Sequence, residues 1–175
     1  AIAGGKIKIK GCNTDYLNSF IEKLVETGVN IKKDKNEIMV EKNIDVLKPI
    51  NVITAPYPGF PTDLQAQLMT LTCFSKGISK FEEKIFENRF MHVPELIRMG
   101  ANIEVQGGIA KVTGVNKLKG APVMATDLRA SVSLILAGLA SSGETVISRV
   151  YHLDRGYENI EKKLSNCGAN IRRFK

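Results

Sequence analysis

PTDLQAQLM at residues 61–69 and ATDLRASVS at residues 125–133 are two versions of one helix start. Both place Thr-Asp-Leu ahead of an apolar run, with an alanine two residues further on. Gln65 in the first stretch is replaced by Arg129 in the second. A helix start that returns with one changed residue indicates an internal repeat whose copies have different tasks.

A second motif recurs three times and sets the size of the repeat. Gly5, Gly77 and Gly143 each begin a β-rich run, followed by a helical pattern that ends at a glycine before Val-Asn-Ile or Ala-Asn-Ile. The spacing of the starting glycines gives a period of about 70 residues. We therefore divide the chain into three repeat units of the βαβαββ type, at about 1–48, 49–116 and 117–175.

Each unit is predicted to contain a strand, an amphipathic helix that ends at a C′ glycine, and a second strand (NIKK, NIEV or NIRR). In the first two units a hairpin turn follows, at DKNE (34–37) and at Gly107-Gly108. The second and third units also have a front half, which is a strand followed by the Thr-Asp-Leu helix. The first unit lacks this front half and the third lacks a hairpin partner, so we expect a fragment of a longer polypeptide.

The two Thr-Asp-Leu helices predict an unusual layering. Residues 126–141 have almost no polar face, and residues 62–76 are similar. A helix that is apolar nearly all round is buried. We therefore expect an α/β protein with its helices inside and its sheets outside, whereas α/β proteins ordinarily place the sheet in the middle.

The charge balance leaves the choice of partner open. The formal net charge is +7, which is common among nucleic-acid-binding proteins. However, the lysines are scattered among acids, tryptophan is absent, and no stretch interleaves arginine with aromatic residues as a base-stacking surface does. We expect a solvated basic surface and small anionic ligands, with no nucleic-acid partner.

Several classes of function are disfavoured. No apolar run approaches the roughly 20 residues that span a bilayer, and the N-terminal residues lack a signal-peptide layout, so we expect a cytoplasmic protein with no membrane partner. Cys12, Cys73 and Cys167 form no CxxC pair and are interpreted as reduced thiols. His92 and His152 have no second ligand at metal-binding spacing, so neither a metal nor another cofactor is expected.

The Thr-Asp pair has a purely structural explanation. Thr62 is predicted as an N-cap that forms a capping box with Gln65, and Asp63 complements the positive end of the helix dipole. Arg129 is different, because a cation in the first turn of a helix faces that positive end and costs a few tenths of a kcal/mol or more.

Two more arginines are expected at helix starts. Arg155 follows the expected cap Asp154, and Arg89 follows Asn88, although Pro94 moves the start of that helix towards Val93. Each arginine alone is compatible with a solvated side chain or a local ion pair. Several guanidinium groups at helix starts, without visible compensation, favour a site that grips a phosphate or carboxylate.

Four stretches carry a resemblance to a known family: TAPYPGFPTDLQAQ, IFENRFMHVPELIRMGA, VMATDLRAS and HLDRGYENIEKKL. Through them the chain resembles the C-terminal part of the bacterial UDP-N-acetylglucosamine enolpyruvyl transferases. The likeness runs through the whole chain and is most specific from Val52 onward. It implies one of two lobes, each an inside-out α/β barrel, completed by a short segment from the N-terminus of the same polypeptide. The implied reaction moves an enolpyruvyl group from phosphoenolpyruvate to the 3′-hydroxyl of UDP-N-acetylglucosamine and releases phosphate, which is the first committed step of peptidoglycan synthesis.

The same resemblance implies the site residues. Asp63 matches the aspartate that contacts the sugar hydroxyl as its proposed general base, and Ile85 matches a position that lines the nucleotide-sugar site. Arg155 matches an arginine that holds phosphoenolpyruvate and is grouped with Asp63 as catalytic. The other charged residues expected around this substrate are Arg89, Asp127 and Arg129.

The family's catalytic cysteine, and a lysine that contacts phosphoenolpyruvate, belong to the other lobe, and no cysteine of this chain occurs in that motif. The isolated chain is therefore expected to be inactive without the missing N-terminal lobe. Two alternatives remain open at this point. One is the sister enzyme that acts on shikimate 3-phosphate, which the signatures ATDLRAS and DRGYE disfavour. The other is a non-catalytic module that binds anions or nucleic acid.

Overall fold

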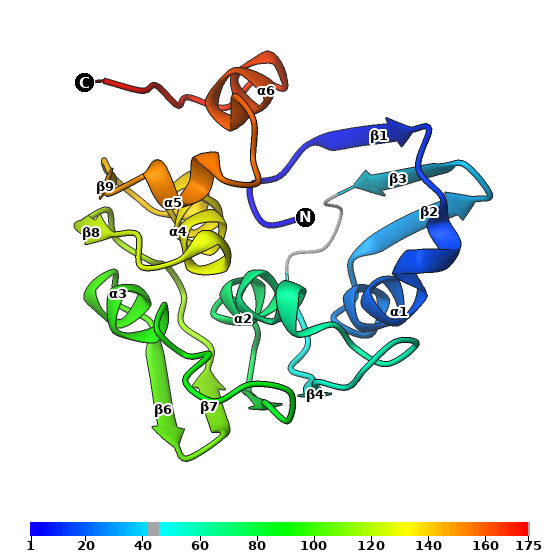
Figure 1. Ribbon diagram of the computed structural model, residues 1–175, viewed down its shortest axis with the longest axis horizontal. Helices are drawn as coiled ribbons and strands as arrows, with labels where there is room; N and C mark the ends of the chain where they lie inside the picture. Colours follow the sequence, from blue (N-terminus) through cyan, green and yellow to red (C-terminus); the bar gives the residue numbers. More distant parts are fainter. Residues whose placement is uncertain (42–45, 175) are drawn as a thin grey trace.

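A computed structural model describes residues 1–41 and 46–174 (Figure 1). The first 41 residues form an antiparallel sheet with the strand order β1-β3-β2, and a helical segment precedes β2. The elements are β1 (Lys6–Lys10), η1 (Thr14–Leu17), α1 (Asn18–Glu26), β2 (Asn30–Asp34) and β3 (Glu37–Glu41).

The next stretch forms a mixed sheet with the order β4-β5-β7-β6, in which β4 pairs with β5 in parallel and the other pairs are antiparallel. Its strands are β4 (Asn51–Ile53), β5 (Ile78–Glu82), β6 (Asn102–Gln106) and β7 (Ile109–Thr113). Its helices are η2 (Thr62–Leu64), α2 (Gln65–Thr72) and α3 (Val93–Arg98).

The last stretch pairs two short parallel strands and carries three helices. Its elements are β8 (Pro122–Met124), α4 (Leu128–Ala140), β9 (Val146–Ser148), α5 (Tyr151–Asp154) and α6 (Ile160–Asn166). Among the residues that the structure describes, no helix is long and apolar enough to cross a membrane.

The helices α2 and α4 pack against each other in the middle of the molecule, and the sheets lie around them (Figure 1). Every residue of α2 except Gln67 is buried, and α4 buries its residues from Ala130 through Ile135. Both helices contribute to one core together with Phe81 of β5, which is fully buried. The expectation that the two Thr-Asp-Leu helices are buried is therefore confirmed, whereas α6 contains no buried residue.

The turn and helix-end predictions also hold. Gly28, Gly100 and Gly168, which follow α1, α3 and α6, have φ values of 93°, 94° and 94°. This left-handed conformation is the one that a C′ residue adopts, and glycine reaches it without strain. The hairpins β2–β3 and β6–β7 turn at the expected places, with Gly107 and Gly108 in the second turn.

The strand expected at NIRR is wrong. Residues 170–174 are not assigned to a strand, although the corresponding NIKK and NIEV segments form β2 and β6. In those two sheets the middle strand, β3 or β7, pairs with the strands on both sides. No described strand lies between β9 and residues 170–174, and an extended segment without a ladder partner is not a strand.

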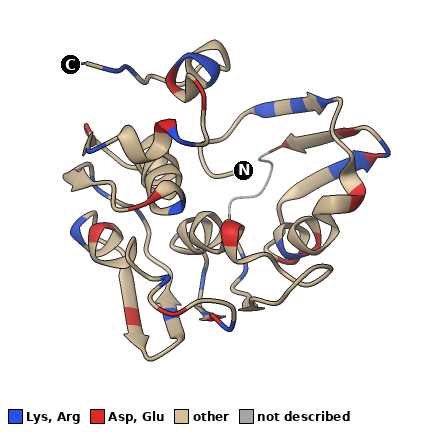
Figure 2. Ribbon diagram, in the orientation of Figure 1, with Lys and Arg blue, Asp and Glu red and all other residues tan. Residues whose placement is uncertain are grey.

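Lysines on β1 face acids on its neighbour β3 (Figure 2). Lys8 lies 2.7 Å from Glu37, and Lys6 lies 3.8 Å from Glu41. All four side chains are largely solvated, so each pair contributes at most about 1 kcal/mol. Part of the basic composition is therefore balanced locally on the surface of this sheet.

Candidate active site

Asp63 of η2 and Arg129, in the first turn of α4, lie against each other. Arg129 Nε donates to Asp63 Oδ1 at 2.5 Å, and Arg89 Nη2 lies 4.0 Å from the same oxygen. The Asp63 side chain is 62% exposed, whereas that of Arg89 is only 18% exposed. The packing of α2 against α4 thus brings one solvated carboxylate to two guanidinium groups that are distant in sequence.

Asp127 caps α4 and fixes the backbone of Arg129. Its carboxylate accepts from Arg129 N at 2.7 Å and from Ala130 N at 3.0 Å, while its carbonyl accepts from the hydroxyl of Ser131. Such a cap contributes roughly 1 kcal/mol to a helix. Arg129 is therefore in the first turn of α4, as expected, and Asp127 orients it through the main chain.

The predicted N-cap at Thr62 is wrong. A 3₁₀ turn, η2, separates Thr62 from α2, and no side chain caps either segment. The hydroxyl of Thr62 instead donates to Glu83 Oε2 at 2.9 Å, and Gln65 is the first residue of α2. The capping box therefore does not form, because a buried acid from another part of the chain uses the capping hydroxyl.

Glu83 is a residue that the sequence analysis missed. It is 9% exposed and directly follows β5. The alternation of β5 places Glu83 on the same side as Phe81, which is fully buried, whereas Glu82 points outward and pairs with Lys84 at 3.2 Å. An acid on the apolar face of a strand was the available signal, since such a position normally takes a hydrophobic residue.

Ile85 and Arg89 line a cavity of about 750 Å³ between the loop that follows β5 and the β6–β7 turn. The Arg89 guanidinium lies 4.3 Å from the centroid of the Phe86 ring, a cation–π distance. Arg89 belongs to the turn that follows Asn88 and not to a helix, because α3 begins at Val93. Pro94 indicated this later start. Arg89 therefore belongs both to this cavity and to the Asp63 cluster.

The position predicted for Arg155 is wrong. Arg155 ends the short helix α5, and the next helix, α6, begins only at Ile160. Asp154 caps nothing, because its carboxylate accepts from Arg173 at 2.6 and 2.9 Å, and this hydrogen bonding lowers the pKa of Asp154. A cation suits the C-terminal end of a helix, so the argument from an unfavourable dipole fails for Arg155.

Arg155 still lies beside the start of α4. The next residue, Gly156, packs so closely on Leu128 that a Cβ there would lie 3.0 Å from its side chain. The Arg155 side chain is exposed and enters no ion pair or hydrogen bond within the part of the chain that the structure describes. Arg129 therefore lies in the first turn of α4, and the exposed Arg155 lies beside this turn.

Burial shifts the pKa values of His92 and Cys73 away from neutrality. Burial lowers the pKa of His92 from 6.5 to about 4, and the charge of Asp127 partly opposes this shift. Burial also raises the pKa of Cys73 to about 12, so its thiol stays protonated at neutral pH. No group of three metal-binding side chains occurs in residues 1–41 and 46–174. One carboxylate and two guanidinium groups are thus the charged side chains that meet at Asp63.

Comparison with known proteins gives concordant matches. A model of the family described as EPSP synthase (3-phosphoshikimate 1-carboxyvinyltransferase) matches residues 1–164. A UDP-N-acetylglucosamine 1-carboxyvinyltransferase from Cereibacter sphaeroides (strain ATCC 17029 / ATH 2.4.9) is 61% identical over 99% of this chain and 41% of its own length. Its counterpart from Dinoroseobacter shibae is 59% identical over the whole chain and 42% of its own length. The crystal structure of the enolpyruvyl transferase NikO from Streptomyces tendae superposes with a TM-score of 0.89 at 29% identity, covering 98% of this chain and 42% of that one.

The sheet topology, the buried helices and this superposition define a mixed α/β fold of the kind found in enolpyruvyl transferases. The chain belongs to the EPSP synthase (3-phosphoshikimate 1-carboxyvinyltransferase) family, because the family model matches nearly its full length. The chain spans about 41% of the length of the relatives that it matches.

We predict that His92 makes the protein less stable in mild acid. The buried ring stays neutral down to a pH of about 4, whereas an unfolded chain binds a proton below about 6.5. The free energy of unfolding therefore has its full value above pH 6.5. It falls by roughly 3 kcal/mol in total as the pH drops towards 4. Urea unfolding of the full-length protein at pH 7.5 and pH 5 measures this loss. His92→Leu should reduce it and His152→Leu should not; an equal loss in wild type and His92→Leu contradicts the assignment.

Proposed function

We propose that this chain is part of an enzyme that transfers the enolpyruvyl group of phosphoenolpyruvate to the 3′-hydroxyl of UDP-N-acetylglucosamine, the first committed step of peptidoglycan synthesis. The observation that carries the proposal is the meeting of Asp63, just before α2, with Arg129 of α4 and with Arg89 of the turn before α3. The identity of 61% to a UDP-N-acetylglucosamine 1-carboxyvinyltransferase supports the acceptor.

The arginines suit phosphoenolpyruvate. This substrate carries a phosphate and a carboxylate, and guanidinium groups bind such groups in a bidentate manner. Arg129, Arg89 and Arg155 provide the cations. The reaction breaks the bond between the enol carbon and the phosphate oxygen, and cations around the phosphate stabilise the charge that this oxygen acquires.

Asp63 suits the acceptor hydroxyl. A carboxylate within hydrogen-bond reach of a hydroxyl orients it and takes its proton as the oxygen bonds to the enol carbon. The Asp63 side chain is solvated enough to meet a substrate, and its bond to Arg129 restrains it. An anionic substrate that engages Arg129 competes with Asp63 for the guanidinium. Binding of phosphoenolpyruvate would thereby free the carboxylate for the sugar hydroxyl.

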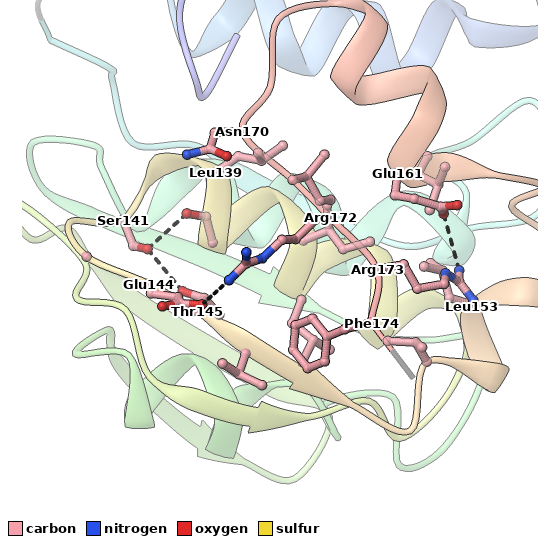
Figure 3. Close-up of a pocket in the computed structure, with 18 residues that line it drawn as sticks. Leu139, Ser141, Glu144, Thr145, Leu153, Glu161, Asn170, Arg172, Arg173 and Phe174 are labelled. Carbon is pink, nitrogen blue, oxygen red and sulfur yellow. Dashed lines mark hydrogen bonds and ion pairs between the residues drawn. The ribbon is translucent and has the colours of Figure 1, made fainter.

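We further propose that the chain is an incomplete inside-out α/β barrel lobe built from the three units at about 1–48, 49–116 and 117–175. The supporting feature is a groove of about 690 Å³ between β9 and residues 170–174, floored by α4 (Figure 3). Val146 and Ile147 line one wall, and Ile171 and Phe174 line the other. The middle strands β3 and β7 occupy the equivalent place in the first two sheets. A strand from the remainder of the same polypeptide fits this groove.

The proposed partners follow from the same reading. The substrates are phosphoenolpyruvate and UDP-N-acetylglucosamine, and the other lobe of the polypeptide supplies the family's catalytic cysteine. Both substrates are strongly charged and do not cross bilayers unaided, so we propose a cytoplasmic location.

Phosphate release tests the reaction directly. The full-length protein should release inorganic phosphate from phosphoenolpyruvate when UDP-N-acetylglucosamine is added, because this acceptor carries the 3′-hydroxyl. Shikimate 3-phosphate in its place should release none, which separates the two acceptors of this family. The isolated 175-residue chain, shown to be folded by circular dichroism, should also release none. Turnover with shikimate 3-phosphate alone would contradict the proposed acceptor.

The role of Asp63 is tested by Asp63→Asn in the full-length protein. The amide cannot take a proton, so kcat should fall by about 10²- to 10⁴-fold, the usual contribution of general base catalysis. The matched control is Asp15→Asn, which changes an exposed aspartate in the first turn of the other 3₁₀ helix, η1. A kcat for Asp63→Asn close to that of the control would exclude Asp63 as the base.

Hydrogen exchange tests the strand groove. Backbone amides of residues 172 and 173 should exchange slowly in the full-length protein and fast in the isolated chain, because an added strand satisfies them only in the former. Residues 103–105 of β6 are the internal control, since β7 pairs with them in this chain. Equal exchange at residues 172 and 173 in both proteins would mean that the groove stays unfilled.

A further inference from the structure

The carboxylate of Glu83 ties together the two segments that carry Asp63 and Ile85. Its Oε2 accepts from Thr62 Oγ1 at 2.9 Å. Its Oε1 accepts from Thr54 Oγ1 at 2.8 Å and from the amides of Ile85 and Phe86 at 2.9 and 3.2 Å. One buried side chain thus holds the start of η2, the residue after β4, and the loop that lines the Ile85 cavity.

The environment of Glu83 is unusual for a residue with only a packing role. It is 9% exposed, and within the described ranges 1–41 and 46–174 its contacts are neutral donors with no cation among them. Burying a carboxylate without a cation is costly unless hydrogen bonds satisfy it. Lysine is available nearby, because Lys84 pairs with the adjacent Glu82. The buried carboxylate of Glu83 is therefore stabilised by hydrogen bonds from hydroxyl and amide donors.

Asp63 needs such an anchor. Its side chain contacts Arg129 and Arg89, which are the groups that an anionic substrate would engage. Once those contacts are shared with substrate, they no longer fix the carboxylate. The bond from the neighbouring Thr62 to Glu83 is independent of the arginines, so it remains when substrate binds.

We propose that Glu83 is a positioning residue that holds Asp63 through Thr62 and holds the nucleotide-sugar loop through the amides of Ile85 and Phe86. This inference rests on the proposed function and extends it. Because Oε2 serves η2 and Oε1 serves the loop, the two tasks are separated on the two oxygens of one carboxylate.

Two substitutions in the full-length protein separate these tasks. Thr62→Val removes only the bond to η2, so kcat should fall about 10- to 100-fold, as misplacing a catalytic group does, while KM for UDP-N-acetylglucosamine stays within about twofold. Glu83→Gln loses the charge that strengthens all four bonds, so kcat should fall and this KM should also rise, about 5- to 10-fold.

The controls are Thr62→Ser, which keeps the hydroxyl and should restore kcat, and Glu82→Gln, which removes the adjacent outward-facing acid and should leave both constants unchanged. A purely structural role lowers the folded fraction and cannot raise KM, so the KM change discriminates between the two roles. If Glu83→Gln does not fold, the comparison of Thr62→Val with Thr62→Ser decides.

If the wild-type protein turns over its substrates, either of two results overturns the positioning role and leaves the proposed function intact. One is an unchanged kcat for Thr62→Val, and the other is an unchanged KM for a folded Glu83→Gln variant. A folded wild-type protein without turnover contradicts the proposed function, and the positioning role with it.

Discussion

The packing of α2 against α4 is the constraint on which the site depends. Both helices are buried on nearly all sides, so each needs neighbours all round, and each is a principal neighbour of the other. Their starts consequently lie together. Asp63, just before α2, and Arg129, in the first turn of α4, meet there although they are 66 residues apart in the sequence. The second Thr-Asp-Leu stretch has Arg129 where the first has Gln65, and this arginine gives the site opposite charges on its two sides.

That arrangement has consequences for how the site would work. The carboxylate that would serve the sugar hydroxyl is held, in the unliganded state, by the same guanidinium that would bind the anionic substrate. The two functions are coupled by competition for one cation. Once Asp63 is released from Arg129, its main chain must be held by contacts that do not involve the arginines. The hydrogen bond from Thr62 to the buried Glu83 is such a contact. Burial of His92, which lies near enough to Asp127 to feel its charge, meanwhile keeps this imidazole neutral at neutral pH.

The failed local predictions share one physical reason. Thr62 has the right residue type for an N-cap, and Asp154 has it for another, yet both side chains are used by partners distant in sequence. Local capping rules apply when the capping side chain has no hydrogen-bond partner from a distant part of the chain. The strand expected at residues 170–173 fails in the same way, because a strand requires a neighbour and the pattern of one segment does not provide it. In contrast, Asp127 does cap α4, since within residues 1–41 and 46–174 its carboxylate accepts only from the amides of Arg129 and Ala130.

By itself, the sequence determined the elements whose causes are local: the hairpin turns, the glycines that end the helices, the burial of the two apolar helices and the first-turn position of Arg129. Periodicity and backbone sterics act over a few residues, and they can be read without coordinates. Only the tertiary structure decided which side chains meet. The Asp63–Arg129–Arg89 cluster, the four bonds to Glu83 and the place of Arg155 at a helix end depend on how separate elements pack, and the pattern within any one element carries no information about the distance to another.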